Sequence, residues 1–140
     1  MSKFTTFAND LLDAEYDTGA SGTLALGPVS SRVNYTLPIK VRLTTTVSTA
    51  GTPGTAVSGG SYADQALTSS MAAASGASKA SNAALTYSNM PACTWADVMT
   101  VDSTGSPKNM NFRGGSSLAK TVNSGDTALI PSGSFTGTEA

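Results

Sequence analysis

The chain has 140 residues, a formal net charge of −1 and no histidine, and only 12% of its residues are charged. Serine, threonine, alanine and glycine make up about half of it, so hydroxyl groups supply much of the polarity that charges supply in an average protein. Lysines and arginines occur singly, without the basic stripe that neutralises a phosphate backbone, and we expect no nucleic-acid partner.

The sequence also argues against a membrane span, a secretory signal and an internal disulfide. It has no apolar run of membrane-spanning length and no charged start followed by an apolar segment, so we expect no membrane partner. Cys93 is the one cysteine. It stands near Trp95 among apolar residues, with no histidine to lower its pKa, which favours a buried structural thiol over a reactive one.

The first predicted element is a short α-helix in "SKFTTFANDLLDAEYD", capped by Ser2 and ended before Gly19. Its apolar side chains recur at helical spacing and gather on one face. That face either packs on the core of its own domain or docks on a neighbouring subunit. The candidate partner contacts are Phe4, Phe7, Leu11 and Leu12. We expect residues 1–17 to form this arm and residues 18–140 to form one β-sandwich domain.

Residues 18–31 predict a loop, although "TLAL" could pair briefly. The period then changes to two, and Ile39, Val41 and Leu43 share one face of the strongest predicted strand. Lys40, Arg42 and Thr44 lie on the other face, and Pro38 marks the strand's start or an edge. A glycine- and proline-rich loop follows, and Gly59 and Gly60 supply the turn that leads into a strand beginning at Tyr62.

The segment "TSSMAAASGASKASNAALTY" is ambiguous between strand, loop and strand, with "NAALTY" as the second strand, and a short helix. Beyond it, residues 94–101 alternate in polarity, "DSTGSPKN" predicts a hairpin turn before "MNFR", and "NSGD" predicts a tight turn between "AKTV" and "TALI". Short strands separated by turns predict a mainly β fold, an antiparallel sandwich or partial barrel with a short N-terminal α-helix. The predicted core comprises Val41, Leu43, Tyr62, Trp95, Val98 and Leu129.

No catalytic constellation is evident. Without histidine the chain has no imidazole base, no Ser-His-Asp or Cys-His arrangement and no imidazole metal ligand. The acidic residues Asp10, Asp13, Glu15 and Asp17 cluster, but they follow the predicted helix without calcium-loop spacing, which favours a solvated helix end. "FRGGSS" lacks the lysine and spacing of a phosphate loop. We expect no enzyme activity, no catalytic residue, no cofactor and no metal.

Four stretches in order resemble a family of small bacteriophage virion proteins, usually labelled phage tail fibre or minor tail proteins and in some phages decorating the capsid. They are "LPIKVRLTTTVSTAGTPGTAVSGGSYADQALT", "SNAALTY", "MPACTWADVMTVD" and "AKTVNSGDTALIPSGSFT". The most specific pieces run from Val57 to Asp64 and from Lys120 to Thr127. Asp64 stands where such proteins usually have arginine, and Met99 to Asp102 stand where they have "HFGI".

The resemblance implies a structural protein on the surface of the virion, made in the cytoplasm of the host bacterium. We expect a capsid decoration or cement protein that stabilises the shell by binding neighbouring capsid subunits. The alternative is a tail-associated fibre or minor tail protein that contributes to recognition of the host surface. The expected partners are the major capsid protein or other virion proteins and further copies of the chain, with a glycan if the protein is on the tail. Exposed Tyr16, Tyr35 or Trp95 would favour the glycan reader.

Overall fold

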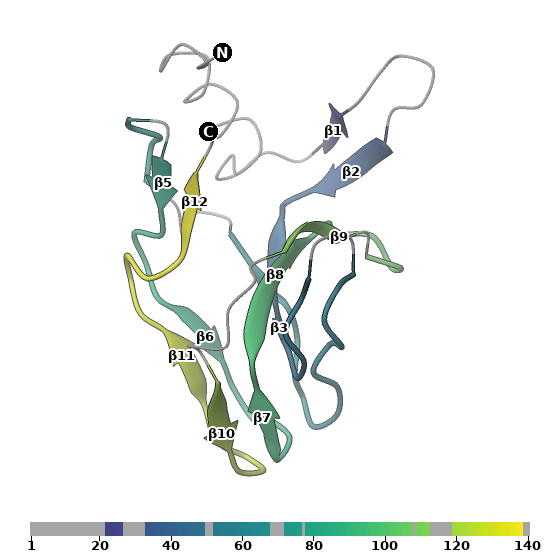
Figure 1. Cartoon of the computed structure of the whole chain (residues 1–140), viewed down its shortest axis with the longest axis vertical. Helices are drawn as coiled ribbons and strands as arrows, with labels where there is room; N and C mark the ends of the chain where they lie inside the picture. Colours follow the sequence, from purple (N-terminus) through teal and green to yellow (C-terminus); the bar gives the residue numbers. More distant parts are fainter. Residues whose placement is uncertain are drawn as a thin grey trace. The chain divides into compact units, whose positions relative to one another are not determined.

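The computed structural model describes residues 22–26, 33–49, 52–67, 72–76, 78–107, 109–112 and 119–138, which form short β-strands and their connections (Figure 1). The strands are β1 Gly22–Leu26, β2 Val33–Leu37, β3 Lys40–Thr44, β4 Gln65–Ala66, β5 Ser78–Ala80, β6 Leu85–Tyr87, β7 Cys93–Trp95, β8 Asp97–Val101, β9 Asn109–Phe112, β10 Lys120–Val122, β11 Ala128–Ile130 and β12 Thr136–Thr138. They make a four-stranded sheet in the order β4-β3-β8-β9 and the pairs β1-β2, β10-β7, β11-β6 and β12-β5.

The described residues fall into two compact units, the first within residues 1–39, 66–85 and 130–140. In this unit β1 and β2 pair antiparallel from Gly22 opposite Leu37 to Leu26 opposite Val33, and β12 pairs antiparallel with β5. Ser81 ties the end of β5 to the chain before β12, because its N–H donates to the Phe135 carbonyl at 2.8 Å. The buried apolar side chains of the unit are Ile39, Leu67, Leu85, Ile130 and Phe135.

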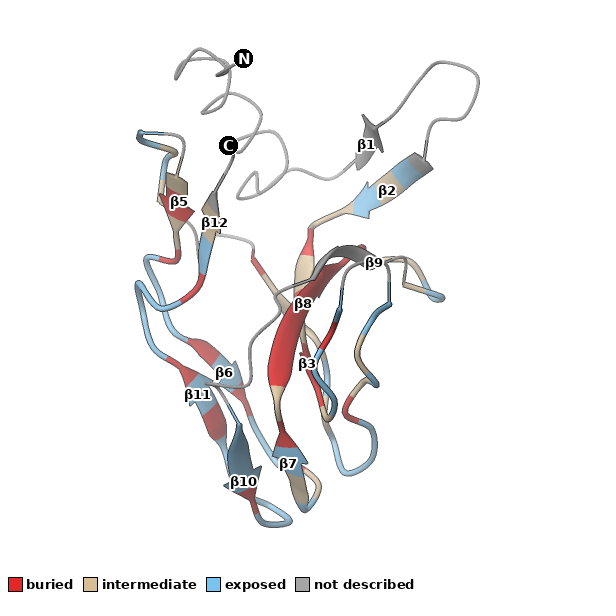
Figure 2. Cartoon of the chain, viewed as in Figure 1, coloured by how far each residue is buried: buried red, intermediate tan, exposed pale blue. Residues whose placement is uncertain are grey.

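The second unit, within residues 40–65 and 86–129, is organised around β8. This strand lies between β3 and β9, and all five of its residues are buried (Figure 2). Val41 faces Thr100 and Leu43 faces Val98 in the antiparallel register of β3 with β8. A strand covered on both faces and both edges needs no polar alternation, which explains its uniform burial.

The buried carboxylate of Asp97 anchors the loop that follows β3. Asp97 is fully buried, and its Oδ2 accepts the Ser48 N–H at 3.0 Å. Ser48 in turn accepts the Gly54 N–H with its hydroxyl at 3.0 Å. A side chain at Gly54 would collide with the Thr46 carbonyl, so the loop packs backbone against backbone there. Asp97 Oδ1 is buried without a hydrogen-bond partner in the described part of the chain.

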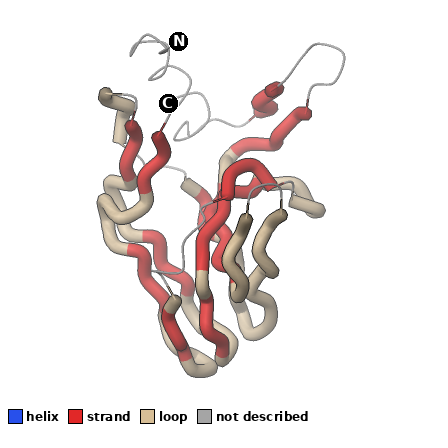
Figure 3. The backbone as a smooth tube through the Cα atoms, viewed as in Figure 1, coloured by secondary structure: helices blue, strands red, loops and turns tan. Residues whose placement is uncertain are grey.

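The mainly β, antiparallel prediction is confirmed for the described residues, where every segment is strand, turn or loop and no helix occurs (Figure 3). The helix expected in residues 1–17, with its candidate contacts Phe4, Phe7, Leu11 and Leu12, lies outside them. The division at residue 17 and the sandwich or partial barrel stay predictions. The prediction of strand, loop and strand, as opposed to a short helix, is correct over residues 72–76 and 78–87, which contain β5 and β6 and no helix.

The loop predicted for residues 18–31 is wrong over Gly22–Leu26, which forms β1, whereas the pairing allowed for "TLAL" is confirmed. Glycine and serine weaken a strand locally, and antiparallel pairing with β2 supplies the hydrogen bonds that stabilise it. The turn 102–107 between β8 and β9 is confirmed, with a register irregularity between Thr100 and Val101. The tight turn "NSGD" is also confirmed, since the Asp126 N–H donates to the Asn123 carbonyl at 3.1 Å. However, β10 and β11 pair with β7 and β6 instead of with each other.

Four of the six predicted core side chains are buried, namely Val41, Leu43, Trp95 and Val98. Tyr62 is half-buried. Placing Leu129 in the core is wrong, because 46% of it is exposed while its neighbours Ala128 and Ile130 are buried. A strand turns alternate side chains to opposite faces, and β11 buries the small alanine in place of the leucine.

We predict that Asp97→Ala lowers the free energy of unfolding by about 1–3 kcal/mol, because it leaves the Ser48 N–H buried without an acceptor. Asp97→Asn keeps an oxygen that can accept this N–H and should cost less. Urea denaturation of the two variants and the parent protein tests the difference. An Asp97→Ala midpoint equal to that of the parent would show that Asp97 does not anchor the loop.

Candidate functional site

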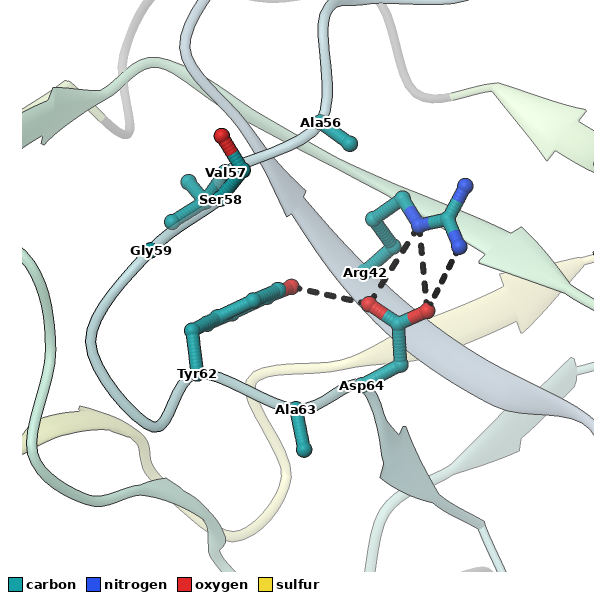
Figure 4. Close-up of a pocket in the computed structure, with 8 residues that line it drawn as sticks. All are labelled: Arg42, Ala56, Val57, Ser58, Gly59, Tyr62, Ala63 and Asp64. Atoms are coloured by element: carbon teal, nitrogen blue, oxygen red, sulfur yellow. Dashed lines mark hydrogen bonds and ion pairs between the residues drawn. The ribbon is translucent and has the colours of Figure 1, made fainter.

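An open hollow of about 340 Å³ in the second unit is the candidate functional site (Figure 4). Strand β3 contributes one lining residue, and the segment from residue 56 to residue 64 contributes the others. The lining residues are Arg42, Ala56, Val57, Ser58, Gly59, Tyr62, Ala63 and Asp64. The hollow therefore combines one cation and one anion with small, mostly apolar neighbours.

The charged residues of the hollow form a two-pronged ion pair. Arg42 Nη2 lies 2.7 Å from Asp64 Oδ2, and Arg42 Nε donates to Oδ2 at 3.0 Å and to Oδ1 at 3.3 Å. The side chains are only 18% and 13% exposed, respectively. Such side-on pairing fixes the plane of the guanidinium as well as its distance from the carboxylate.

Tyr62 connects this ion pair to the backbone of the sheet. Its hydroxyl donates to Asp64 Oδ1 at 3.0 Å and accepts the Leu43 N–H at 2.7 Å. Its ring stacks on Tyr87, with centroids 5.8 Å apart and planes inclined by 8°. The Tyr87 hydroxyl donates to the Val41 carbonyl at 3.1 Å. The two rings thus hold both the side chains of the hollow and the backbone of β3.

Both phenols are shifted toward the protonated form. Burial raises the pKa of Tyr62 well above its usual value, and the neighbouring Asp64 carboxylate raises it further. Burial also raises the pKa of Tyr87, with smaller contributions from Tyr62 and Asp64. Tyr62 therefore stays a hydrogen-bond donor to Asp64 and does not act as a base at neutral pH.

The predicted turn at Gly59 and Gly60 is present and positions Tyr62. Their φ angles are +100° and +59°, which glycine adopts more readily than other residues. A Cβ on Gly60 would lie 2.8 Å from the Asn89 carbonyl oxygen, which also accepts the Ser61 N–H at 3.3 Å. Asn89 Nδ2 donates to Ser61 Oγ at 2.8 Å, so two hydrogen bonds join the turn to the chain before β7.

The residues that would favour a glycan reader do not line this hollow. Trp95 is buried, with 5% exposed, and its Nε1 has no hydrogen-bond partner within the described ranges. Tyr35 is half-buried, and Tyr16 lies outside the described residues. Cys93 is half-buried, and burial raises the pKa of its thiol, which disfavours a reactive thiolate.

Sequence reasoning missed the pairing of Arg42 with Asp64. Alternation correctly placed Arg42 opposite the core-facing residues of β3. The strand expected to begin at Tyr62 starts only at Gln65 as β4, so Tyr62 and Asp64 lie in the connection before it. Nothing local indicated that two residues 22 positions apart would meet. The only available signal was that an arginine and an aspartate stand on polar faces of two neighbouring predicted strands.

The described residues contain no group of three or more histidine, cysteine, aspartate or glutamate side chains that could hold a metal ion. The acidic cluster at Asp10, Asp13, Glu15 and Asp17 lies outside them. The residues that the structure describes contain no helix long and apolar enough to cross a membrane. What the hollow offers chemically is a fixed set of hydrogen-bonding groups.

The family model described as Podophage GP4 fiber I protein gp80 matches residues 23–138. The match covers the described strands from Thr23 in β1 to Thr138 in β12, and it includes every residue that lines the hollow. No curated protein and no solved structure matches the chain.

We predict that Gly60→Ala destabilises the protein by at least about 1–2 kcal/mol, because alanine must adopt a left-handed conformation and its Cβ meets the Asn89 carbonyl. Gly105→Ala is the matched control, since a Cβ there has open space and no positive φ is required. Thermal unfolding of both variants provides the comparison. Equal loss in the two variants would contradict the role given to Gly60.

We predict that stability falls as the pH rises above about 10, the ordinary pKa of tyrosine. Below that pH both states keep neutral phenols, whereas above it the unfolded chain loses protons that folded Tyr62 and Tyr87 retain. Urea midpoints measured from neutral to alkaline pH give the size of the fall. Tyr62→Phe with Tyr87→Phe should reduce it, and an unchanged fall would assign it to other groups.

Proposed function

Because the chain belongs to the family of Podophage GP4 fiber I protein gp80, we propose that it is a structural subunit of a phage tail fibre. Membership makes it a fibre-type protein of the virion, and the match over residues 23–138 is the observation that carries the proposal. Its work is to bind other molecules, and the partners are neighbouring fibre subunits, other virion proteins and the surface of the host cell.

The surface chemistry supports a role in assembly. Exposed residues of the described strands include many threonines, and Thr94 on β7 and Thr121 on β10 share a hydrogen bond of 2.8 Å between their hydroxyls. Burying hydroxyls and alanines against a partner costs less desolvation than burying lysine or glutamate. A chain with 12% charged residues can therefore cover large areas with copies of itself or with other subunits.

A binding role is also favoured over an enzymatic one. The sequence has no histidine, Asp64 accepts hydrogen bonds from both Arg42 and Tyr62, and the Tyr62 phenol stays protonated. These groups hold one another in place and leave no base adjacent to a nucleophile in the hollow. The protein accordingly acts without a catalytic residue, a cofactor or a metal.

Capsid decoration, in which the chain would bind the major capsid protein, is the competing location on the virion. The fibre description of the family favours the tail. Phe4, Phe7, Leu11 and Leu12 stay the predicted contacts with a partner in either place, and self-association stays part of the proposal. Fibre subunits occur in few copies, whereas a decoration protein repeats with the symmetry of the shell.

Quantitative mass spectrometry of purified virions, with the major capsid protein as the internal standard, tests the location. We predict a copy number far below that of the capsid protein, together with immunogold labelling confined to the tail or its fibres. A copy number comparable to that of the capsid protein, with label over the whole shell, would replace the fibre role with capsid decoration.

A further inference from the structure

We propose that the hollow beside Arg42 binds a carboxylate-bearing sugar, such as a uronic acid unit of a polysaccharide on the host cell surface. This inference rests on the proposed fibre function, because it names the ligand class that the fibre would contact. It concerns a specific set of groups, namely the guanidinium of Arg42, the ring of Tyr62 and the small residues between them.

The first argument is the unused edge of the Arg42 guanidinium. Nε and Nη2 face Asp64, whereas Nη1 makes no hydrogen bond within the described part of the chain. Nη1 points away from Asp64 (Figure 4). Nη1 and the second N–H of Nη2 form the end-on fork of the guanidinium, which matches the two oxygens of a carboxylate.

The second argument is that Asp64 selects the charge of the ligand. Arg42 is already neutralised by one carboxylate 2.7 Å away, so the pair as a whole carries no net charge. Attraction to Arg42 and repulsion from Asp64 both scale with the charge of the ligand and largely cancel. The cost of removing a dianionic phosphate from water is much larger than that of a monoanion, which gains two charge-assisted hydrogen bonds. The geometry therefore favours a single planar carboxylate over a phosphate group.

The third argument is the shape and lining of the rest of the hollow. A volume of about 340 Å³ is at the lower end of ligand pockets, large enough for one sugar ring. The lining is mostly small and apolar, with Ala56, Val57, Gly59 and Ala63, and Ser58 adds an exposed hydroxyl at the rim. Tyr62 stacks on Tyr87 with one face, so its edge and remaining face are what it can present to the C–H groups of a sugar.

The fourth argument is that the recognising group is held in place before the ligand arrives. The Leu43 N–H fixes the Tyr62 hydroxyl, that hydroxyl fixes Asp64, and Asp64 fixes Arg42. A guanidinium that is already oriented loses less conformational entropy on binding than a free one. One open hollow still binds weakly, and a fibre that presents several copies multiplies the affinity through avidity.

The experiment is an NMR titration of the full-length protein with glucuronate, with glucose as the uncharged match and acetate as a monocarboxylate without a sugar ring. We expect glucuronate to shift the amide signals of Ala56, Ser58 and Ala63, and glucose and acetate to bind at least about tenfold more weakly. Arg42→Lys, which keeps the charge but lacks the fork, should weaken glucuronate binding at least about tenfold.

Two further variants separate recognition from folding and from overall charge. Ser58→Trp blocks the rim without touching the ion pair and should abolish binding in a folded protein. Lys120→Ala removes a cation from exposed β10 and should leave binding unchanged. Backbone amide spectra establish that each variant is folded.

Several results would overturn the inference while the fibre role stands, since virion copy number and labelling test that role separately. Absence of glucuronate binding would overturn the inference. Equal binding of glucose would show that the carboxylate is not recognised. Equal binding of acetate would show that the sugar ring is not recognised and would make acidic protein side chains the expected ligands. Arg42→Lys binding as well as the parent would show that the fork is not the recognising group.

Discussion

The Tyr62 hydroxyl is the interaction on which the arrangement of the hollow depends. It accepts the Leu43 N–H of β3 and donates to the Asp64 carboxylate, which in turn holds the Arg42 guanidinium. The backbone of the sheet thereby fixes the positions of these surface side chains. Burial and the adjacent carboxylate keep this phenol protonated. A phenylalanine would fill the same space but would leave both the Leu43 N–H and Asp64 without this partner.

The position of Tyr62 depends in turn on the tight turn that precedes it in the chain. Gly59 and Gly60 reverse the backbone with positive φ angles, and Asn89 receives and donates the hydrogen bonds that fix Ser61. On the other side of the ring, Tyr87 supplies a stacking surface from the end of β6. A loop of mostly small residues thereby positions an aromatic side chain without any regular secondary structure of its own.

Much of the local structure could be predicted from the sequence, because alternation and turn chemistry are properties of neighbouring residues. The burial of Val41 and Leu43, the turn at Gly59 and Gly60 and the hairpin after β8 follow from such patterns. The partners of β1, β10 and β11 could not be predicted, because they depend on which other strand supplies the hydrogen bonds.

The candidate site shows the same division. The sequence predicted Tyr62 as a core residue at the start of a strand, whereas Tyr62 and Asp64 lie in the connection before β4. No sequence pattern indicated a partner for Arg42. Arg42 and Asp64 are 22 residues apart in the sequence, and the return of the chain to the edge of β3 brings them together. The prediction for Leu129 was wrong for a different reason. Its hydrophobicity predicted burial, whereas the alternation of side chains along β11 places it on the exposed face.

The uniform burial of β8 has a consequence for how this chain can change through evolution. Substitutions in β8 disturb neighbours on every side, so its positions tolerate little variation. Ser58 and Ala63, in contrast, are exposed residues of a connecting segment and anchor no other part of the described fold with their side chains. Mutations at these positions can alter the rim of the hollow and leave the sheet intact, so the surface chemistry of the hollow can diverge while the scaffold is retained.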